Sequence, residues 1–429
     1  MNKTTAYLQW GFVQLFFIVS VIFSVMFGVY SPNITGELSV NPAEFGLLSG
    51  VFFIFYAMVQ FYSGKLFVKI PPKLILFISA IISACGCFLL SIAPSLALLF
   101  VARILLGIGL AATYVGVLYI IQKNFEGKDF PVMSSVSQCL ANLAGTLFAF
   151  FGGGIISHLS YKAFFSVLSI CFVICAVCIL VFVGSKNKTT EEPVAESSLF
   201  ADMKIIVRYG QVWWAALFFT GLFGAIISFA NLFATSFQVN AFSITTKDAV
   251  SITSMILLGV TIGSIFAGVI SNKLNNYVLT ARLFSAISMF SFIIVLYARL
   301  HFLPHHLDAM IIYFIFGFGL GGSVLAFQAI QENVKEESLR PLATSFVLTI
   351  SYVFAGFVEQ PVIGQILNSV KMHILNDPEQ VSILVSKTFL DLKVHDNLYK
   401  YSAGLTFVLV TIVASFIASL FLRKGNDTK

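Results

Sequence analysis

The sequence predicts an all-α integral membrane protein with twelve transmembrane helices in two pseudo-symmetric six-helix bundles. Of its 429 residues, 58% are hydrophobic and only 10% are charged, whereas an ordinary soluble domain carries roughly 25% charged residues. A mean hydropathy of +0.95 excludes a soluble enzyme, a nucleic-acid-binding protein and a disordered scaffold. The apolar residues form long blocks, which disfavours an outer-membrane barrel, because its strands alternate apolar and polar residues.

Twelve blocks of the sequence are long enough to cross a bilayer, whose hydrocarbon core, roughly 30 Å thick, needs about 20 apolar residues in a helix. The first block is longer than the apolar core of a signal peptide and has no small-residue cleavage site, so we expect it to remain as the first helix. Charged, proline-rich and turn-forming segments separate the blocks, which span residues 8–30, 44–63, 74–92, 95–121, 131–157, 161–184, 210–239, 248–271, 278–298, 307–330, 342–369 and 399–422.

The widest polar break lies in the middle of the chain and reads GSKNKTTEEPVAESS. It separates six apolar blocks from the next six. The sequence therefore predicts an N-terminal bundle over 1–184, a cytoplasmic linker over 185–209 and a C-terminal bundle over 210–429.

A second polar stretch, at about 371–398, lies between the last two blocks. Asp377 and Pro378 are typical of a helix start, as cap and first-turn residues. The apolar residues that follow share one helical face. We therefore expect a short amphipathic helix that lies on the outer membrane surface.

The distribution of the Lys and Arg residues predicts the orientation in the membrane. With the N-terminus in the cytoplasm, most of the 25 basic residues fall in cytoplasmic segments. The short outer loops are nearly free of them, and the outer excess is concentrated in the single stretch at 371–400. The positive-inside rule then places both termini in the cytoplasm. The absence of a eukaryotic targeting feature favours a bacterial inner membrane.

The two halves of the sequence share a pattern of glycines. The fourth block contains ARILLGIGLAA with Gly107, and the tenth contains YFIFGFGLGG with Gly317. The same spacing separates Gly154 from Gly364 in the fifth and eleventh blocks. These matches indicate duplication of a six-helix unit, an architecture typical of one large class of secondary transporters.

At these positions the chain resembles the major facilitator superfamily over essentially its whole length. The family's loop between the second and third spans reads Gly-x-x-x-Asp-Arg-x-Gly-x-Arg-Arg. This chain keeps the glycine and basic residues, but Val68 takes the place of the Asp. The resemblance implies a cytoplasmic gating loop, with a second copy in the C-terminal half, formed by Gly64, Lys69, Lys73, Asn272 and Lys273.

Further comparison with the family concerns the fourth span, the direction of transport and the kind of solute. Arg103 and Gly107 fit the family's Arg-x-x-x-Gly signature in the fourth span. The antiporter signature of the fifth span is absent, because NLAGTLFAFFGGG contains no proline, and this absence favours uptake over drug efflux. The segments SPNITGEL and EQPVIGQIL are similar to those of bacterial members that take up amino acids or other small organic solutes.

Only two charged residues, Arg103 and Glu359, lie plainly inside the apolar blocks. A charge at bilayer depth costs between about 2.5 and 17 kcal/mol, so such residues are usually functional. The resemblance implies that both spans border a central cavity. We interpret Glu359 as the group that binds the coupling proton and Arg103 as its partner or as the anchor of a substrate carboxylate. The alternative is a static salt bridge that locks the two halves together.

Polar residues at helical spacing accompany these charges. Gln138 and Asn142 lie four residues apart, and Ser228 precedes Asn231 by three. Amides offer both donors and acceptors, which suit an amino acid or a similar zwitterion. The alternative role is hydrogen bonding between helices, worth about 0.6 kcal/mol per bond. The predicted substrate-binding residues are Gln14, Tyr56, Gln60, Arg103, Gln138, Asn142, Asn231, Tyr352 and Glu359.

Several motifs that the sequence lacks narrow the range of possible functions. The chain has no Gly-x-x-x-x-Gly-Lys-Ser/Thr segment, so we expect transport driven by a gradient rather than by ATP. Cys171, Cys175 and Cys178 share a helical face without a histidine, which is typical of core packing rather than of a metal site. We expect no cofactor, no metal and no enzymatic activity.

The sequence thus predicts a secondary active transporter of a small polar organic solute, working by alternating access and coupled to proton uptake. Its expected partners are the solute, protons and the lipid bilayer, with no nucleic acid, and it is expected to act as a monomer. Two alternatives stay open: proton-coupled efflux of a drug or siderophore, and a non-transporting receptor or assembly factor with the same fold.

Overall fold

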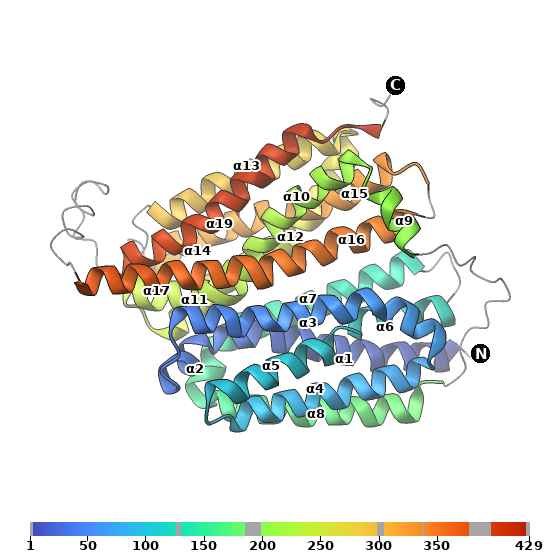
Figure 1. Ribbon diagram of the computed structural model, residues 1–429, viewed down its shortest axis with the longest axis horizontal. Coiled ribbons are helices and arrows are strands. Elements are labelled where there is room, and N and C mark those ends of the chain that lie inside the picture. The colour runs from blue at the N-terminus through green and yellow to red at the C-terminus, as the bar shows by residue number, and fades with distance from the viewer. Residues whose placement is uncertain are drawn as a thin grey trace. The chain divides into compact units, whose positions relative to one another are not determined.

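The computed structural model describes residues 3–125, 130–184, 199–297, 304–336, 339–376 and 396–425, and these residues form helices and the short turns between them (Figure 1). Twelve of the helical segments are long and apolar enough to cross a membrane. Their bounds agree with the predicted blocks to within a few residues. The sixth, for example, spans Tyr161–Phe182, and the twelfth spans Tyr399–Phe421.

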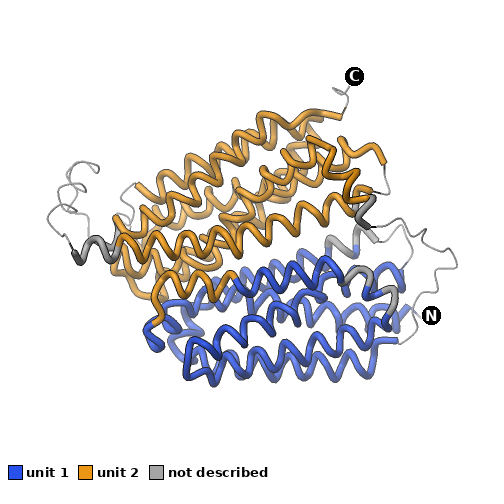
Figure 2. The backbone as a smooth tube through the Cα atoms, viewed as in Figure 1, with its two compact units in different colours: residues 1–39, 51–196 blue, residues 40–50, 197–429 orange. Residues whose placement is uncertain are grey.

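The first compact unit comprises residues 1–39 and 51–196 (Figure 2). Its fourth span is formed by two helices, α5 and α6, joined by a turn at Ala111 and Ala112. The helices of this unit, with α3 shared between the two units, are α1 (Lys3–Val29), α2 (Ser31–Glu37), α3 (Pro42–Lys69), α4 (Pro72–Ile92), α5 (Leu96–Leu110), α6 (Thr113–Asn124), α7 (Phe130–His158) and α8 (Tyr161–Phe182).

The second compact unit comprises residues 40–50 and 197–429, so the first turns of α3 belong to it. Its helices are α9 (Leu199–Ile206), α10 (Gly210–Gly224), η2 (Ala225–Phe233), α11 (Ala234–Phe242), α12 (Thr246–Leu274), α13 (Tyr277–Tyr297), η3 (Pro304–His306), α14 (Leu307–Leu320), η4 (Gly321–Val324), α15 (Leu325–Asn333), α16 (Arg340–Val353), η6 (Phe354–Glu359), α17 (Gln360–Asn376) and α19 (Asp396–Phe421).

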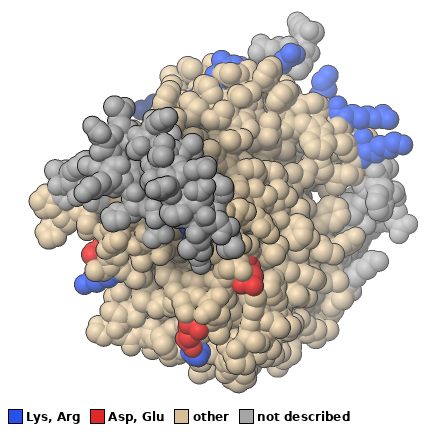
Figure 3. Space-filling model, turned by 60° about the vertical axis from the view of Figure 1, so that its left-hand side comes forward, with Lys and Arg blue, Asp and Glu red and all other residues tan. Residues whose placement is uncertain are grey.

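The predicted domain boundaries stay predictions. Most of the central linker, 185–198, lies outside the described residues, whereas 199–206 forms α9. The greater part of the predicted amphipathic helix, 377–395, also lies outside them. Over the face drawn in Figure 3, charged side chains are sparse, as expected for a chain whose surface meets lipid.

The glycine repeat corresponds to a repeated helix crossing. In the first unit, a Cβ added to Gly107 on α5 would meet the backbone carbonyl of Phe52 on α3. In the second unit, a Cβ added to Gly317 on α14 would meet the carbonyl of Ile256 on α12. In each unit the fourth span therefore crosses the second at a distance that only glycine permits, as small residues do in membrane helices.

Two spans of the second unit contain π-helical turns. The seventh span contains η2, and the eleventh contains η6, which ends at Glu359. Such turns are rare and are found frequently at functional sites. Pro361, two residues after the end of η6, has no N–H to donate to the preceding turn, which favours irregular winding at this point.

Candidate functional site

Arg103 lies in α5 of the first unit and is only 2% exposed. Its guanidinium carbon is 4.0 Å from the ring centroid of Phe27 and 4.4 Å from that of Phe52, with Phe23 at 5.9 Å. Aromatic faces attract a cation, and the attraction grows when both groups are shielded from water. The rings of α1 and α3 therefore offset part of the cost of burying this charge.

Glu359 lies in the second unit and is fully buried. Its carboxyl group accepts a hydrogen bond from Thr411 Oγ1 on α19, with 2.9 Å to Oε1, and one from Ser228 Oγ on η2, with 3.0 Å to Oε2. A Cβ on Gly224 would collide with this carboxyl group. The seventh and twelfth spans thus shape a polar niche for the carboxyl group of the eleventh, and within this unit its hydrogen-bond partners are hydroxyls.

Arg103 and Glu359 belong to different units, and the predicted pairing between them stays a prediction. What each unit provides by itself is distinct. The first unit surrounds a cation with aromatic rings, whereas the second surrounds an acid with neutral hydroxyl groups. These two surroundings suit different tasks, because a hydroxyl-lined carboxyl group accommodates a proton and an arginine remains charged.

The other predicted substrate residues of the first unit form two small groups. Gln14 is buried and donates from Nε2 to the carbonyl of Ser137 on α7, at 2.9 Å. Gln138, the next residue, donates to Asn142 Oδ1 at 3.0 Å, so the spacing correctly predicted neighbours on one face. Tyr56 stacks on Phe52, with centroids 5.7 Å apart, and Phe52 in turn contacts Arg103. Gln60 is half-buried one turn further along α3.

In the second unit, the predicted Asn231 and Tyr352 are both half-buried. Asn231 Oδ1 is enclosed but has no hydrogen-bond partner among the described residues. The Tyr352 ring meets Phe223 edge to face, with centroids 5.0 Å apart. Neither of these side chains is a hydrogen-bond partner of Glu359.

The predicted gating residues lie on helix ends rather than in a loop. Gly64 and Lys69 belong to the last turns of α3, and Asn272 and Lys273 belong to the last turn of α12. Lys73 is half-buried in the first turn of α4. The thickness of the apolar core of the bilayer limits the length of each hydrophobic block. The helix itself can continue beyond the block, into residues that are polar or charged.

Sequence reasoning missed several residues of these sites. Thr411 is one hydroxyl among many in α19, and no spacing singles it out. Gln238, which donates from Nε2 to the Tyr313 hydroxyl inside the second unit, was also missed. The repeat offered a signal for this pair, because Tyr313 precedes Gly317 as Arg103 precedes Gly107. Each of these two side chains also has an aromatic neighbour. The Phe229 ring lies 6.0 Å from the Tyr313 ring, and the Phe27 ring contacts Arg103.

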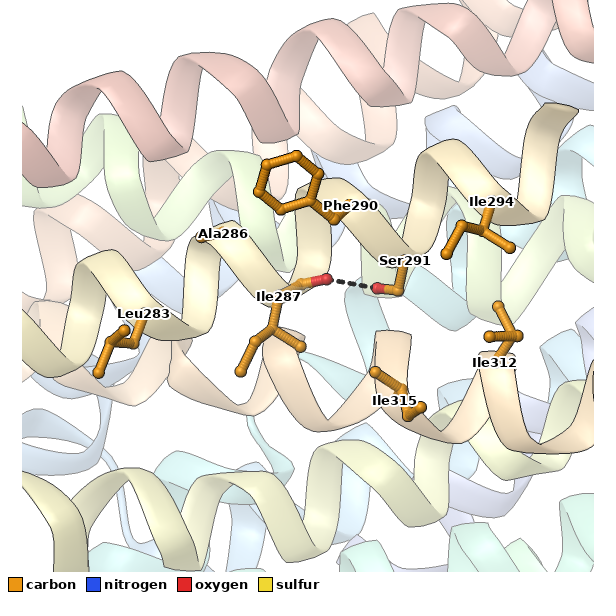
Figure 4. A pocket seen from close by; sticks show the side chains of 8 residues that line it. All are labelled: Leu283, Ala286, Ile287, Phe290, Ser291, Ile294, Ile312 and Ile315. Atoms are coloured by element: carbon orange, nitrogen blue, oxygen red, sulfur yellow. Dashed lines mark hydrogen bonds between the residues drawn. The ribbon is translucent and has the colours of Figure 1, made fainter. Parts of the chain in front are cut away.

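A surface hollow of about 350 Å³ lies between α13 and α14 (Figure 4). Its one polar side chain, Ser291, donates its hydroxyl to the carbonyl of Ile287 at 2.6 Å. The hollow therefore does not suit a polar solute. It is lined by Leu283, Ala286, Ile287, Phe290, Ser291, Ile294, Ile312 and Ile315.

Comparison with known proteins agrees with this architecture. The sequence profile of the Major Facilitator Superfamily matches residues 14–358. The chain belongs to this superfamily. It is therefore a multi-pass membrane transport protein and not an enzyme.

The superfamily relatives differ in what they carry. The probable nitrate transporter NarT of Staphylococcus epidermidis is 25% identical over 248 residues, which cover 57% of this chain and 61% of that protein. The match thus spans less than two thirds of the relative's length.

Two solved structures of superfamily members resemble this chain. An inward-facing, unoccupied bacterial homologue of the human lysosomal transporter Spinster superposes with a TM-score of 0.78 and 14% identity, covering 98% of each chain. The nucleoside transporter NupG superposes with a TM-score of 0.71 and 14% identity, covering 99% of this chain and 100% of that one. At this identity the likeness shows the fold alone.

Proposed function

We propose that this superfamily member takes up a small polar organic solute, such as an amino acid, by alternating access and with a proton as the coupling ion. The observation that carries the proposal is the fully buried Glu359, held by the hydroxyls of Ser228 and Thr411. Burying an isolated carboxylate is costly, and the group usually becomes neutral by binding a proton. A niche that accommodates both the ionised and the protonated carboxyl group suits a residue that binds and releases a proton as its access to water changes.

We assign Arg103 to the substrate. Ring contacts use the face of the guanidinium, whereas bidentate recognition of a carboxylate uses its N–H edge. The aromatic rings around the guanidinium stabilise its charge inside the unit. The nearby Tyr56 and the amides Gln14, Gln138 and Asn142 of the same unit would supply the neutral donors and acceptors of the solute site.

The similarity to a nitrate transporter supports a second candidate substrate, a small inorganic anion. An arginine over aromatic rings suits nitrate as well as a carboxylate, because both are planar and anionic. The screen described below therefore includes nitrate. The distribution of Lys and Arg supports an orientation with both termini in the cytoplasm. We place the transporter in the bacterial inner membrane because the sequence shows no eukaryotic targeting feature.

The test combines a ligand screen with a transport assay. The purified protein is heated with amino acids, small organic acids and nitrate, and ligands that raise the Tm are carried forward. Uptake into proteoliposomes is then driven by an imposed pH gradient. We expect Glu359→Gln to abolish gradient-driven accumulation while leaving exchange of solute across the membrane, because a neutral amide cannot carry the proton.

The matched control is Glu332→Gln, an exposed carboxyl group on α15, which should transport as the wild type does. If Glu359→Gln accumulates solute normally, proton coupling through this residue is wrong. If solute leaves the vesicles against its gradient instead, the protein is an exporter. If no solute binds or moves, the receptor or assembly-factor alternative is supported.

A further inference from the structure

We infer that the hydroxyl of Ser228 relays the protonation state of Glu359 to the backbone of η6, donating to the carboxylate when the acid is ionised and to the Ala355 carbonyl when it is protonated. This inference rests on the proposed role of Glu359 as a proton site. It makes Ser228 a positioning residue that links proton binding to the contact between the seventh and eleventh spans.

The geometry offers Ser228 two acceptors. Its Oγ lies 3.0 Å from Glu359 Oε2 and 3.1 Å from the carbonyl oxygen of Ala355. A hydroxyl has one hydrogen, so it donates to one of these acceptors at a time. Thr411 faces a similar choice, with Glu359 Oε1 at 2.9 Å and the carbonyl of Val408 at 2.8 Å.

The two choices differ in their consequence. Val408 lies in the same helix as Thr411, so a turn of the Thr411 hydroxyl to Val408 would replace its bond to Glu359 by one inside α19 and would add no bond between spans. Ala355 and Glu359 both lie in η6, whereas Ser228 lies in η2, so Ser228 contacts η6 in either state. Its bond to the Ala355 carbonyl is an additional bond between the two spans when the protonated acid donates to Ser228 Oγ. Ser228 is therefore the residue whose second acceptor adds a bond between helices when Glu359 binds a proton.

Every donor has an acceptor in both states. In the ionised state, the hydroxyls of Ser228 and Thr411 both donate to the carboxylate. When a proton binds at Oε2, the new O–H donates to Ser228 Oγ, and the Ser228 hydrogen turns to the Ala355 carbonyl. Proton binding thus adds a bond between the spans, and proton release removes it.

Another hydrogen bond joins the same two spans but does not involve the carboxyl group. Gln360 Nε2 donates to the Ile227 carbonyl at 3.2 Å. Around Glu359 the seventh and eleventh spans are therefore joined by two hydrogen bonds in the ionised state, Ser228 to Glu359 and Gln360 to Ile227, and by three in the protonated state, when Ser228 also donates to Ala355. Local tightening on proton binding follows from this difference.

Among the side chains of this unit that the structure describes, no titratable group hydrogen-bonds Glu359. The elements packed against η6 are α10, η2, α16 and α17, with α19 contributing Thr411 and the first turns of α3 contacting Gly356 through Gly50. None of the residues on these elements with described side chains, apart from Ser228 and Thr411, hydrogen-bonds Glu359. The titratable residues on these elements are Glu44, Arg340, Tyr352, Lys371, His373, Asp396, Tyr399, Lys400 and Tyr401.

The test is an infrared titration of the purified full-length protein, which needs no substrate. The carbonyl stretch of the protonated acid is assigned by its loss in Glu359→Gln. Ser228→Ala should raise the titration midpoint by about one to two pH units, because a carboxylate that loses a hydrogen bond is harder to ionise. The stretch should also move to higher frequency, because the carboxyl proton has lost its acceptor.

Three further variants separate the relay from general damage. Thr411→Val should raise the midpoint similarly, and Thr411→Ser, which keeps the hydroxyl, should restore it. Ser415→Ala is the matched control, because this buried hydroxyl of α19 donates to the Phe218 carbonyl at 2.7 Å and does not touch Glu359. Its midpoint should equal that of the wild type.

The outcomes distinguish the inference from the proposed function. If the wild type shows a titrating Glu359 band that Ser228→Ala leaves unchanged in midpoint and frequency, the relay is wrong and the proton site stands. A shift in Ser415→Ala as large as that in Ser228→Ala would also overturn the relay. If the wild type shows no titrating band that Glu359→Gln removes, the proposed proton site itself fails.

Discussion

At the scale of single residues, the protein stabilises its two buried charges by opposite means. Arg103 is surrounded by the rings of Phe23, Phe27 and Phe52. Glu359 is surrounded by hydroxyl groups instead. An arginine stays charged and gains from aromatic faces, whereas a carboxyl group can exchange a proton with its surroundings. The residue types thus match a fixed charge and a switchable one.

The contact between Arg103 and Phe27 should be measurable by a double-mutant cycle. Phe27→Leu removes the nearest ring and should lower the free energy of unfolding in detergent by about 1–2 kcal/mol more in the wild type than in Arg103→Met. Equal losses in the two backgrounds would show that the ring contributes only apolar packing.

The bond between Tyr209 and Glu336 predicts a pH-dependent stability outside the membrane spans. The Tyr209 hydroxyl donates to the exposed Glu336 carboxylate, and this hydrogen bond lowers the pKa of Glu336 below its ordinary value. Because the folded pKa is the lower one, the stabilisation is present at neutral pH and is lost as the pH falls through that value. Tyr209→Phe should therefore lower the Tm slightly at pH 7 and not in acid. A difference that persists in acid would contradict this.

At the scale of elements, the repeated glycine crossing and the π-helical turns have distinct roles. The crossings at Gly107 and Gly317 bring the backbones of the second and fourth spans of each unit into contact. Within the described parts of the chain, π-helical turns are found only in the second unit, where η2 and η6 adjoin Glu359. The scaffold is therefore duplicated, whereas the acidic niche is specific to one half.

The crossing can be tested with alanine. Gly107→Ala places a methyl group against the Phe52 carbonyl and should destabilise the protein by about 1–3 kcal/mol, and Gly317→Ala should do so similarly against Ile256. Gly154→Ala, with open space around its added Cβ, should be neutral or stabilising by roughly 0.5–1 kcal/mol. Denaturant unfolding in detergent measures all three. Equal effects at Gly107 and Gly154 would refute a packing role for the glycine.

At the scale of the whole molecule, the chain is a superfamily transport protein whose halves share a framework but not their charges. Tyr313 occupies in the second half the place that Arg103 occupies in the first, and Ala149 stands where the repeat would place a counterpart of Glu359. Duplication thus explains the helices and their crossings. The buried charges of Arg103 and Glu359 are not repeated at the corresponding positions of the other half.

The predicted orientation can be tested at the two ends of α12. The new thiol of Lys247→Cys should react with a membrane-impermeant maleimide added outside intact cells. The new thiol of Lys273→Cys should react only after the membrane is opened. The expectation follows from the excess of Lys and Arg on the side of Lys273. The wild type measures the background from the six native cysteines. The reverse labelling pattern would place both termini outside.

Sequence alone determined the number and bounds of the membrane spans, the repeated glycines and the two charges at bilayer depth. These are local properties, because a hydrophobic block and a lone charge within it are visible without knowing what packs against them. Only the tertiary structure decided that Thr411, Ser228 and Gly224 meet at Glu359, and that aromatic rings surround Arg103. Those contacts join residues from separate spans. In a helix rich in hydroxyl residues and glycines, the sequence does not indicate which of them will contact a given neighbouring helix.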